Sequence, residues 1–177
     1  MIHVSSRLLA SLVASAGLIA TAVLGPTAAL ADEGASGAVY TMTNAVTGNQ
    51  VVILRRSENG RLTPAGMVVT GGNGTGTGLG SGHSLVTTDD GRYLIAVNAG
   101  SNSVSVLRRE SRGLELVGSA VPSGGSRPIS VTVHDDTVYV LNADSNSIAG
   151  FRLDRRSGLR SIDGSIQGLG AGTSVPS

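Results

Sequence analysis

Two stretches of this chain, DDGRYLIAVNAGSNSVSVLRR (89–109) and HDDTVYVLNADSNSIAGFR (134–152), repeat one pattern. Each holds an apolar run, then Asn-Ala-x-Ser-Asn-Ser, then a second alternating run, so that Asn98 recurs 44 residues later as Asn142. An earlier copy, AVYTMTNAVTGNQVVILRR (38–56), places an equivalent asparagine, Asn44, 54 residues before Asn98. The Gly/Thr-rich stretch 71–82 accounts for that longer spacing. A fixed internal period indicates a repeat architecture.

Each copy carries the pattern of short β-strands. In the second copy we expect strands at 83–88, 93–97, 103–107 and 114–120, with Asp90-Gly91 as a tight hairpin and the asparagines as turn formers. The third copy repeats this pattern over 129–166. The first copy lacks its first strand, and its strands are expected to begin at Ala38, Val51 and Gly66.

Four strands in about 44 residues match the blade of a β-propeller, since blades run about 40–50 residues. A β-sandwich of the same strands is the alternative, but it gives no reason for one turn sequence to recur at fixed spacing. We therefore predict an all-β chain with about three blades, at 37–70, 83–120 and 129–166, within a partial propeller over 32–177. Closed propellers have at least four blades, so this ring is expected to be incomplete.

Composition excludes several classes of function. All 13 basic residues are arginine, so neither Schiff-base chemistry nor a P-loop lysine is available. The absence of cysteine excludes disulfides and thiolate sites. Near-balanced charge and 2% aromatic residues disfavour a nucleic-acid partner.

The first 31 residues resemble a secretory signal peptide. A start with one arginine precedes an apolar segment, Leu8–Leu24, and Ala29-Leu30-Ala31 supplies small residues before Asp32. We expect a helix over 8–24, cleavage after Ala31 and a secreted product without a membrane contact. An uncleaved membrane anchor is the alternative.

The repeat, together with the linker GGSRP (124–128), closely resembles the secreted bacterial lactonase-family propellers, which are similar to 6-phosphogluconolactonase and carboxymuconate cyclase. The resemblance covers roughly residues 37–177. It implies a seven-bladed fold and a small lactone or sugar-acid derivative as substrate. The chain ends in a stretch that resembles a linker between blades, so we interpret it as the N-terminal part of a longer protein or a truncated product.

The resemblance also places four residues near the mouth of the central channel: His83, Arg127, Asn98 and Asn142. A histidine could act as general base on a water that attacks a lactone carbonyl, and an arginine could stabilise the oxyanion. His83 and Arg127 are therefore the candidate catalytic residues. The alternative for Arg127 is a surface residue of the linker, which is the commoner role at such a position, and the alternative for His83 is a surface residue at the start of a strand.

The remaining polar clusters favour structural roles. His134-Asp135-Asp136 is typical of a solvated turn, and paired aspartates at hairpin tips, such as Asp89-Asp90, rarely converge on a cation. The glycine run 71–82 has a GxGxxG-like spacing outside any βαβ unit, which favours a mobile loop over a phosphate site. We expect neither a cofactor nor a metal ion.

Two functions follow as hypotheses. The first is an exported lactonase-like propeller that hydrolyses or processes a small lactone. The second is a non-catalytic extracellular propeller that binds a ligand or a protein, because propellers host both kinds of function. Open blade faces and strand edges also predict self-association of the short chain.

Overall fold

The computed structural model of the protein describes residues 35–170, which form strands and turns with no helix among them. The expected signal peptide (1–31) and its helix lie outside the described residues. The first sheet contains β1 (Ala35–Met42), β2 (Gln50–Ser57) and β3 (Leu62–Val69). The second contains β4 (Leu85–Thr87), β5 (Tyr93–Asn98), β6 (Ser103–Glu110) and β7 (Gly113–Pro122). The third contains β8 (Pro128–His134), β9 (Thr137–Asn142), β10 (Ser147–Asp154), β11 (Gly158–Ser161) and β12 (Gln167–Gly168).

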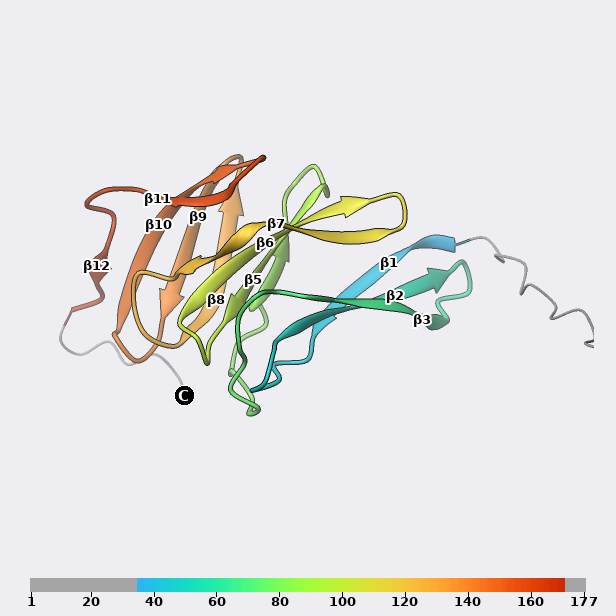
Figure 1. Cartoon of the computed structure of the whole chain (residues 1–177), viewed down its shortest axis with the longest axis horizontal. Helices are drawn as coiled ribbons and strands as arrows, with labels where there is room; N and C mark the ends of the chain where they lie inside the picture. Colours follow the sequence, from blue (N-terminus) through green and yellow to red (C-terminus); the bar gives the residue numbers. More distant parts are fainter. Residues whose placement is uncertain (1–34, 171–177) are drawn as a thin grey trace, which may run out of the picture. The chain divides into compact units, whose positions relative to one another are not determined.

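Within each sheet the strands pair antiparallel in chain order, except that β12 pairs with β10, and consecutive sheets contact each other (Figure 1). This is the arrangement of successive propeller blades, so the prediction of an all-β, incomplete propeller is confirmed. The first sheet has three strands, as its missing first strand predicted.

Several predicted strands differ from the structure. In the first sheet, β1 and β3 begin at Ala35 and Leu62, before the expected starts at Ala38 and Gly66. The strand expected over 83–88 covers only Leu85–Thr87, because the carbonyl of His83 turns away and accepts the Val131 N–H of the third sheet at 2.9 Å. The last strand of the third sheet is divided into β11 and β12, both paired with β10. Between them the Ser165 hydroxyl bonds the backbone N–H and carbonyl of Gly150 at 3.0 and 3.1 Å, which substitutes for strand pairing.

The core lies between the sheets. Alternate residues of β5 face opposite neighbours: Leu94 and Ala96 pack with Val51 of the first sheet, whereas Ile95 and Val97 pack with the third sheet. All five side chains are completely buried. The period of two in the sequence thus supplies two apolar faces to one blade, and each face is covered by the adjacent blade.

Candidate functional site at the linker end of the sheets

Asn98 and Asn142 stand directly before the turns to which the sequence assigned them, and the Asn98 carbonyl accepts the Ser101 N–H at 3.2 Å. They end β5 and β9, and both side chains are fully buried. The residues that take the left-handed conformation in these turns are Asn102 (φ 52°) and Asn146 (φ 45°), which directly precede the next strand. The predicted turns are therefore present, but the left-handed residue of each is the second asparagine of the motif and not the first, because the sequence of the turn does not show which asparagine takes that conformation.

Asn98 is the centre of a buried hydrogen-bond network. Its Oδ1 accepts the Thr70 hydroxyl at 2.7 Å and the Asn49 Nδ2 at 3.0 Å. Its Nδ2 donates to the hydroxyls of Ser105 at 2.8 Å and Ser103 at 3.3 Å. Since Asn49 and Thr70 flank β2 and β3, this one amide joins the first sheet, its outgoing linker and the second sheet.

Asn142 occupies the same position one repeat later, with fewer partners. Its Nδ2 donates to the carbonyl of Ser123 in the next linker at 3.1 Å. Its Oδ1 is buried and accepts no hydrogen bond among the described residues. Ala149 stands where the second sheet has Ser105, which removes one hydroxyl from this site.

The first copy is displaced by one residue from the predicted alignment. Thr43 pairs with Gln50 as Asn98 pairs with Ser103, so Thr43, and not Asn44, is the structural equivalent of Asn98. Asn44 lies in a longer turn at φ 50°, where its Nδ2 donates to the Thr77 carbonyl at 2.6 Å.

The glycine-rich segment is held in place over part of its length. The N–H of Gly74 bonds the Ala45 carbonyl at 2.8 Å, and the N–H of Gly100 bonds the Asn73 carbonyl at 3.0 Å. A Cβ on Gly74 would lie 2.1 Å from the backbone of Asn44. Glycine is thus required here for close approach to the turns of two sheets. The segment is a loop between two sheets, as predicted, and its residues 73 and 74 are hydrogen-bonded to those turns.

Arg127 lies where the second linker enters β8. Its backbone is left-handed (φ 51°), and its N–H donates to the Asn102 Oδ1 at 2.7 Å. Its Nε contacts the Asp144 Oδ1 at 2.5 Å, while the guanidinium's two Nη groups make no hydrogen bond among the described residues. The side chain is 26% exposed. Most of the donors of this guanidinium therefore remain available to an oxygen ligand.

Neither Asp144 nor Asn102 was identified from the sequence as part of a site. Asp144 occupies the variable position of Asn-Ala-x-Ser-Asn-Ser, where the second copy has Gly100. That difference between two otherwise matching turns was the available signal.

His83 lies where the preceding linker reaches β4, and it is exposed. Its backbone carbonyl binds the third sheet, as described above. No hydrogen bond or ion pair joins the side chains of His83 and Arg127 among residues 35–170. Both candidates therefore occupy junctions between a linker and a first strand, without a direct contact.

The hairpin tips at the opposite end form a separate charged cluster. Arg155 contacts Asp90 at 3.1 Å and Asp136 at 3.2 Å, and it lies over the Tyr93 ring. Hydrogen bonds from the Thr88 hydroxyl and the Arg92 N–H, together with Arg155, lower the pKa of Asp90 below its usual value. One aspartate from each of two hairpin tips, Asp90 and Asp136, thus contacts the same arginine.

The neighbouring His134 is the exposed last residue of β8, and its Nδ1 lies 3.7 Å from the Asp89 carboxylate; the predicted turn is formed by Asp135 and Asp136 alone. In the part of the chain that the structure describes, no cluster of three or more acidic, histidine or cysteine residues could hold a metal ion.

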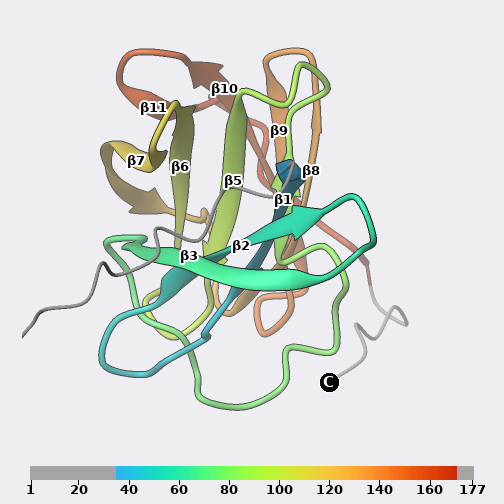
Figure 2. The same cartoon turned by 90° about the vertical axis from the view of Figure 1, so that its right-hand side faces the viewer.

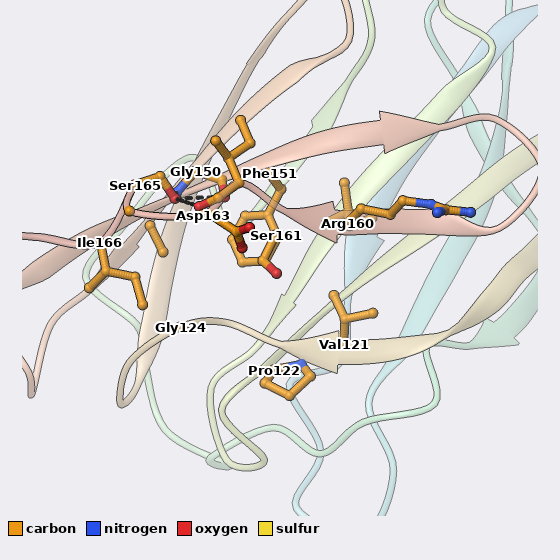
Figure 3. A pocket seen from close by; sticks show the side chains of 14 residues that line it. Val121, Pro122, Gly124, Gly150, Phe151, Arg160, Ser161, Asp163, Ser165 and Ile166 are labelled. Carbon is orange, nitrogen blue, oxygen red and sulfur yellow. Dashed lines mark hydrogen bonds between the residues drawn. The ribbon is translucent and has the colours of Figure 1, made fainter.

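Two pockets flank the linker between the second and third sheets. The larger, about 680 Å³, lies between β7, β10 and β11, with Val121, Phe151 and Ile166 among its lining residues (Figure 3). The second, about 530 Å³, is lined by Asn102, Ser103 and the linker glycines 124 and 125. Neither His83 nor Arg127 lines these two pockets, but Asn102 connects the second to the backbone of Arg127.

Several solved structures share this fold. A functionally unknown protein of Desulfotomaculum acetoxidans is 22% identical, with a TM-score of 0.55 over 67% of this chain and 35% of its own. A 6-phosphogluconolactonase candidate of Bacteroides fragilis is 22% identical, with a TM-score of 0.57 over 70% and 34%. The periplasmic gluconolactonase of Pseudomonas aeruginosa is 20% identical, with a TM-score of 0.52 over 70% and 36%.

The chain spans about a third of the length of these structures. No curated protein sequence matches it at a significant level. The sequence profile of one family, described as lactonase with a 7-bladed beta-propeller, matches residues 35–171.

Proposed function

The chain belongs to the lactonase family of seven-bladed β-propellers, and from this premise we propose that it takes part in the hydrolysis of a small lactone. The names of two similar structures, which refer to gluconolactones, make a sugar lactone the first substrate to test. The proposed reaction adds water to the lactone carbonyl, breaks the ring C–O bond and releases a hydroxy acid.

The conformation of Arg127 is the observation that carries this proposal. Among the described residues, the other non-glycine residues with positive φ are asparagine or aspartate, which tolerate that region. An arginine there costs about 1–3 kcal/mol and persists only where the surroundings impose it. Strain of this kind, at an arginine with unused donors, supports a ligand-binding role.

In the proposed mechanism the Arg127 guanidinium binds the carbonyl oxygen and stabilises the negative charge that develops on it. Asp144 holds the guanidinium through Nε and leaves both Nη groups free for the lactone. His83 accepts the proton of the attacking water, and that proton then passes to the ring oxygen as the C–O bond breaks. The carboxylate product is itself a good ligand for arginine.

The replacement Arg127→Gly separates binding from folding. Glycine relieves the backbone strain, so the free energy of unfolding should stay the same or rise, whereas affinity for gluconate should fall about tenfold or more. Arg156→Gly, at an exposed arginine of the opposite end, is the matched control and should bind normally. Calorimetric titration with gluconate and urea unfolding test both effects. Unchanged affinity in Arg127→Gly would refute the assignment.

Turnover distinguishes the two hypotheses for function. We propose that hydrolysis requires further blades of the same family to complete the ring around this site, since closed propellers contain at least four. Proton release from gluconolactone, measured with and without such blades, tests this requirement. A non-catalytic binding scaffold is the second candidate, supported by the two Nη groups of Arg127, whose donors suit a carboxylate ligand and require no turnover. It predicts gluconate binding with no proton release even from the completed ring.

We further propose that residues 1–31 direct export and are then removed. The segment has the three parts of a secretory signal, and nothing helical within 35–170 is long and apolar enough to cross a membrane. N-terminal sequencing of the protein from the medium or periplasm should begin at Asp32. A product that keeps Met1 in the membrane fraction would support the anchor alternative.

A further inference from the structure

The larger of the two pockets, about 680 Å³, lies between two sheets of this chain. Val121 near the end of β7 and Gly124 in the linker after it line one side. Ala149 and Phe151 of β10 line another side, and both belong to the core that the second and third sheets share. β11, which supplies a third side, lies next to β7 in Figure 2. The walls of this pocket therefore all belong to residues that the structure describes.

The first and second sheets show how the equivalent space is filled one repeat earlier. Leu116 of β7 pairs with Leu107 of β6, and it packs against the core between these two sheets. A Cβ on Gly71, in the linker after β3, would lie 3.4 Å from the Leu116 Cδ2. In the third sheet the residue at the position of Leu116 is Ser161, which pairs with Phe151. A serine thus replaces the leucine that fills the space beside the linker, which leaves room between the third sheet and the linker before it.

The divided last strand of the third sheet forms the rim of the pocket. Between β11 and β12 the chain leaves the strand pairing, and the Ser165 hydroxyl holds this segment to the backbone of Gly150. Ile166 then reaches the linker, since a Cβ on Gly124 would lie 3.5 Å from the Ile166 Cδ1, yet this side chain is 58% exposed. The apolar residues that line the pocket are Val121, Pro122, Phe151, Leu159, Ile162 and Ile166. An apolar molecule in this pocket would therefore remove both its own surface and that of Ile166 from water.

Two charged residues line the pocket, and only one of them has a partner within the described residues. The Arg160 Nε lies 3.4 Å from the Asp154 Oδ2, and the Arg160 side chain extends away from Asp163 in Figure 3. The Asp163 carboxylate makes no ion pair or hydrogen bond within residues 35–170, and the Ser161 hydroxyl makes no hydrogen bond there. Figure 3 shows Ser161 and Asp163 on the same side of the pocket, across from Val121. This side therefore offers a carboxylate and a hydroxyl to a ligand that carries a positive charge.

We propose that this pocket binds a small apolar molecule that carries an ammonium group. The apolar body lies between Val121 and Phe151, and the ammonium group pairs with Asp163 and donates a hydrogen bond to the Ser161 hydroxyl. The volume of about 680 Å³ is within the range of pockets that hold small organic ligands, about 300–1,000 Å³. The candidate catalytic residues do not line this pocket, so the proposal does not depend on the lactone site.

Two probes with the same apolar body test the charge preference: naphthylmethylammonium, which is positively charged, and naphthylmethanol, which is neutral. In calorimetric titrations of the full chain the ammonium probe should bind about tenfold more tightly, because a charge-assisted bond to Asp163 is stronger than a neutral one. Asp163→Asn should remove this difference and leave the affinity for naphthylmethanol nearly unchanged. Asp135→Asn, at an exposed aspartate between β8 and β9, is the matched control and should keep the difference.

Ser161→Leu tests the place of binding, because it introduces the residue that fills the equivalent space in the second sheet. Both probes should then bind about tenfold more weakly, while the urea midpoint should stay the same or rise. Ser111→Leu, at an exposed serine between β6 and β7, should bind both probes like the unchanged chain.

Circular dichroism of each variant checks the fold, and if Ser161→Leu does not fold, Asp163→Asn decides the test alone. Three results would each overturn the proposal. The first is equal affinity of the unchanged chain for the two probes, or no binding of the ammonium probe. The second is a preference for the ammonium probe that survives Asp163→Asn, and the third is unchanged binding in a folded Ser161→Leu variant.

Discussion

Replacing Asn98 and Asn142 by alanine compares two buried amides at one position of the repeat. Asn98→Ala removes four side-chain hydrogen bonds, to Thr70, Asn49, Ser105 and Ser103. At about 1 kcal/mol each, the loss would approach 4 kcal/mol. Asn49 and Thr70 keep other partners, the Val97 and Asn49 carbonyls, so we expect about 3 kcal/mol.

Asn142→Ala should cost far less. It removes one hydrogen bond, to the Ser123 carbonyl, and it also removes a buried oxygen without a partner. We expect a loss of about 1 kcal/mol. Both substitutions delete the same atoms from completely buried sites, so the loss of packing contributes similarly to each. The difference between the two losses in free energy of unfolding therefore measures the contribution of the hydrogen-bond network around Asn98.

Urea unfolding of the full chain measures both free energies. A double-mutant cycle of Asn98→Ala with Thr70→Val should give a coupling energy of about 1 kcal/mol, because the two side chains share a 2.7 Å bond. Equal losses for the two alanine variants, or no coupling, would refute the inference that this network joins the first two sheets.

Three further outcomes are expected. Gly100→Ala should destabilise the protein by about 2 kcal/mol, because a Cβ there would lie 2.1 Å from a linker carbonyl oxygen, whereas Gly78→Ala, with open space around it, should melt like the unchanged protein. Ala149→Ser should raise the free energy of unfolding by about 1 kcal/mol if its hydroxyl reaches the buried Asn142 Oδ1, and a lower value in urea would contradict this. Because the pKa of Asp90 is lowered in the folded state, its contribution is present above about pH 4 and is lost as the pH falls through the lowered value; Asp90→Asn should therefore show a shallower acid unfolding curve.

The period of the repeat made the fold predictable. Details that depend on hydrogen bonds between residues far apart in the sequence could not be predicted. Adjacent apolar residues such as Leu94 and Ile95 point to opposite faces of a strand, so they indicate a strand that is buried on both faces. Such a strand needs a neighbouring sheet on each side. The division of the last strand at 162–166 could not be predicted, because it depends on the Ser165 hydroxyl replacing strand pairing at Gly150. The alternation of apolar and polar residues in the sequence does not indicate a hydrogen bond between a side chain and a distant backbone group.

The candidate site was predicted only in part. Arg127 was selected from its linker position, but its left-handed backbone depends on the Asn102 side chain, 25 residues earlier in the chain. His83 was selected as the first residue of a strand that in fact begins at Leu85. The burial of Asn98 was missed because asparagine favours turns locally, and only the fold shows that Thr70 and Asn49 reach its amide.

The linkers after β3 and β7 also determine the bounds of a repeat unit that could be moved or duplicated as a whole. The N–H of Thr70 bonds the Asn49 carbonyl of the first sheet, while its hydroxyl bonds Asn98 of the second. Ser123 makes the equivalent connection with its backbone: its N–H donates to the Asn102 carbonyl, and its carbonyl accepts the Asn142 Nδ2. Four strands transferred without their linkers would lose the hydrogen bonds through which the linker residue joins two sheets. A repeat unit that can be transferred therefore includes the linker before its four strands and the linker after them. A duplication with these bounds would keep the hydrogen bonds that join one sheet to the next.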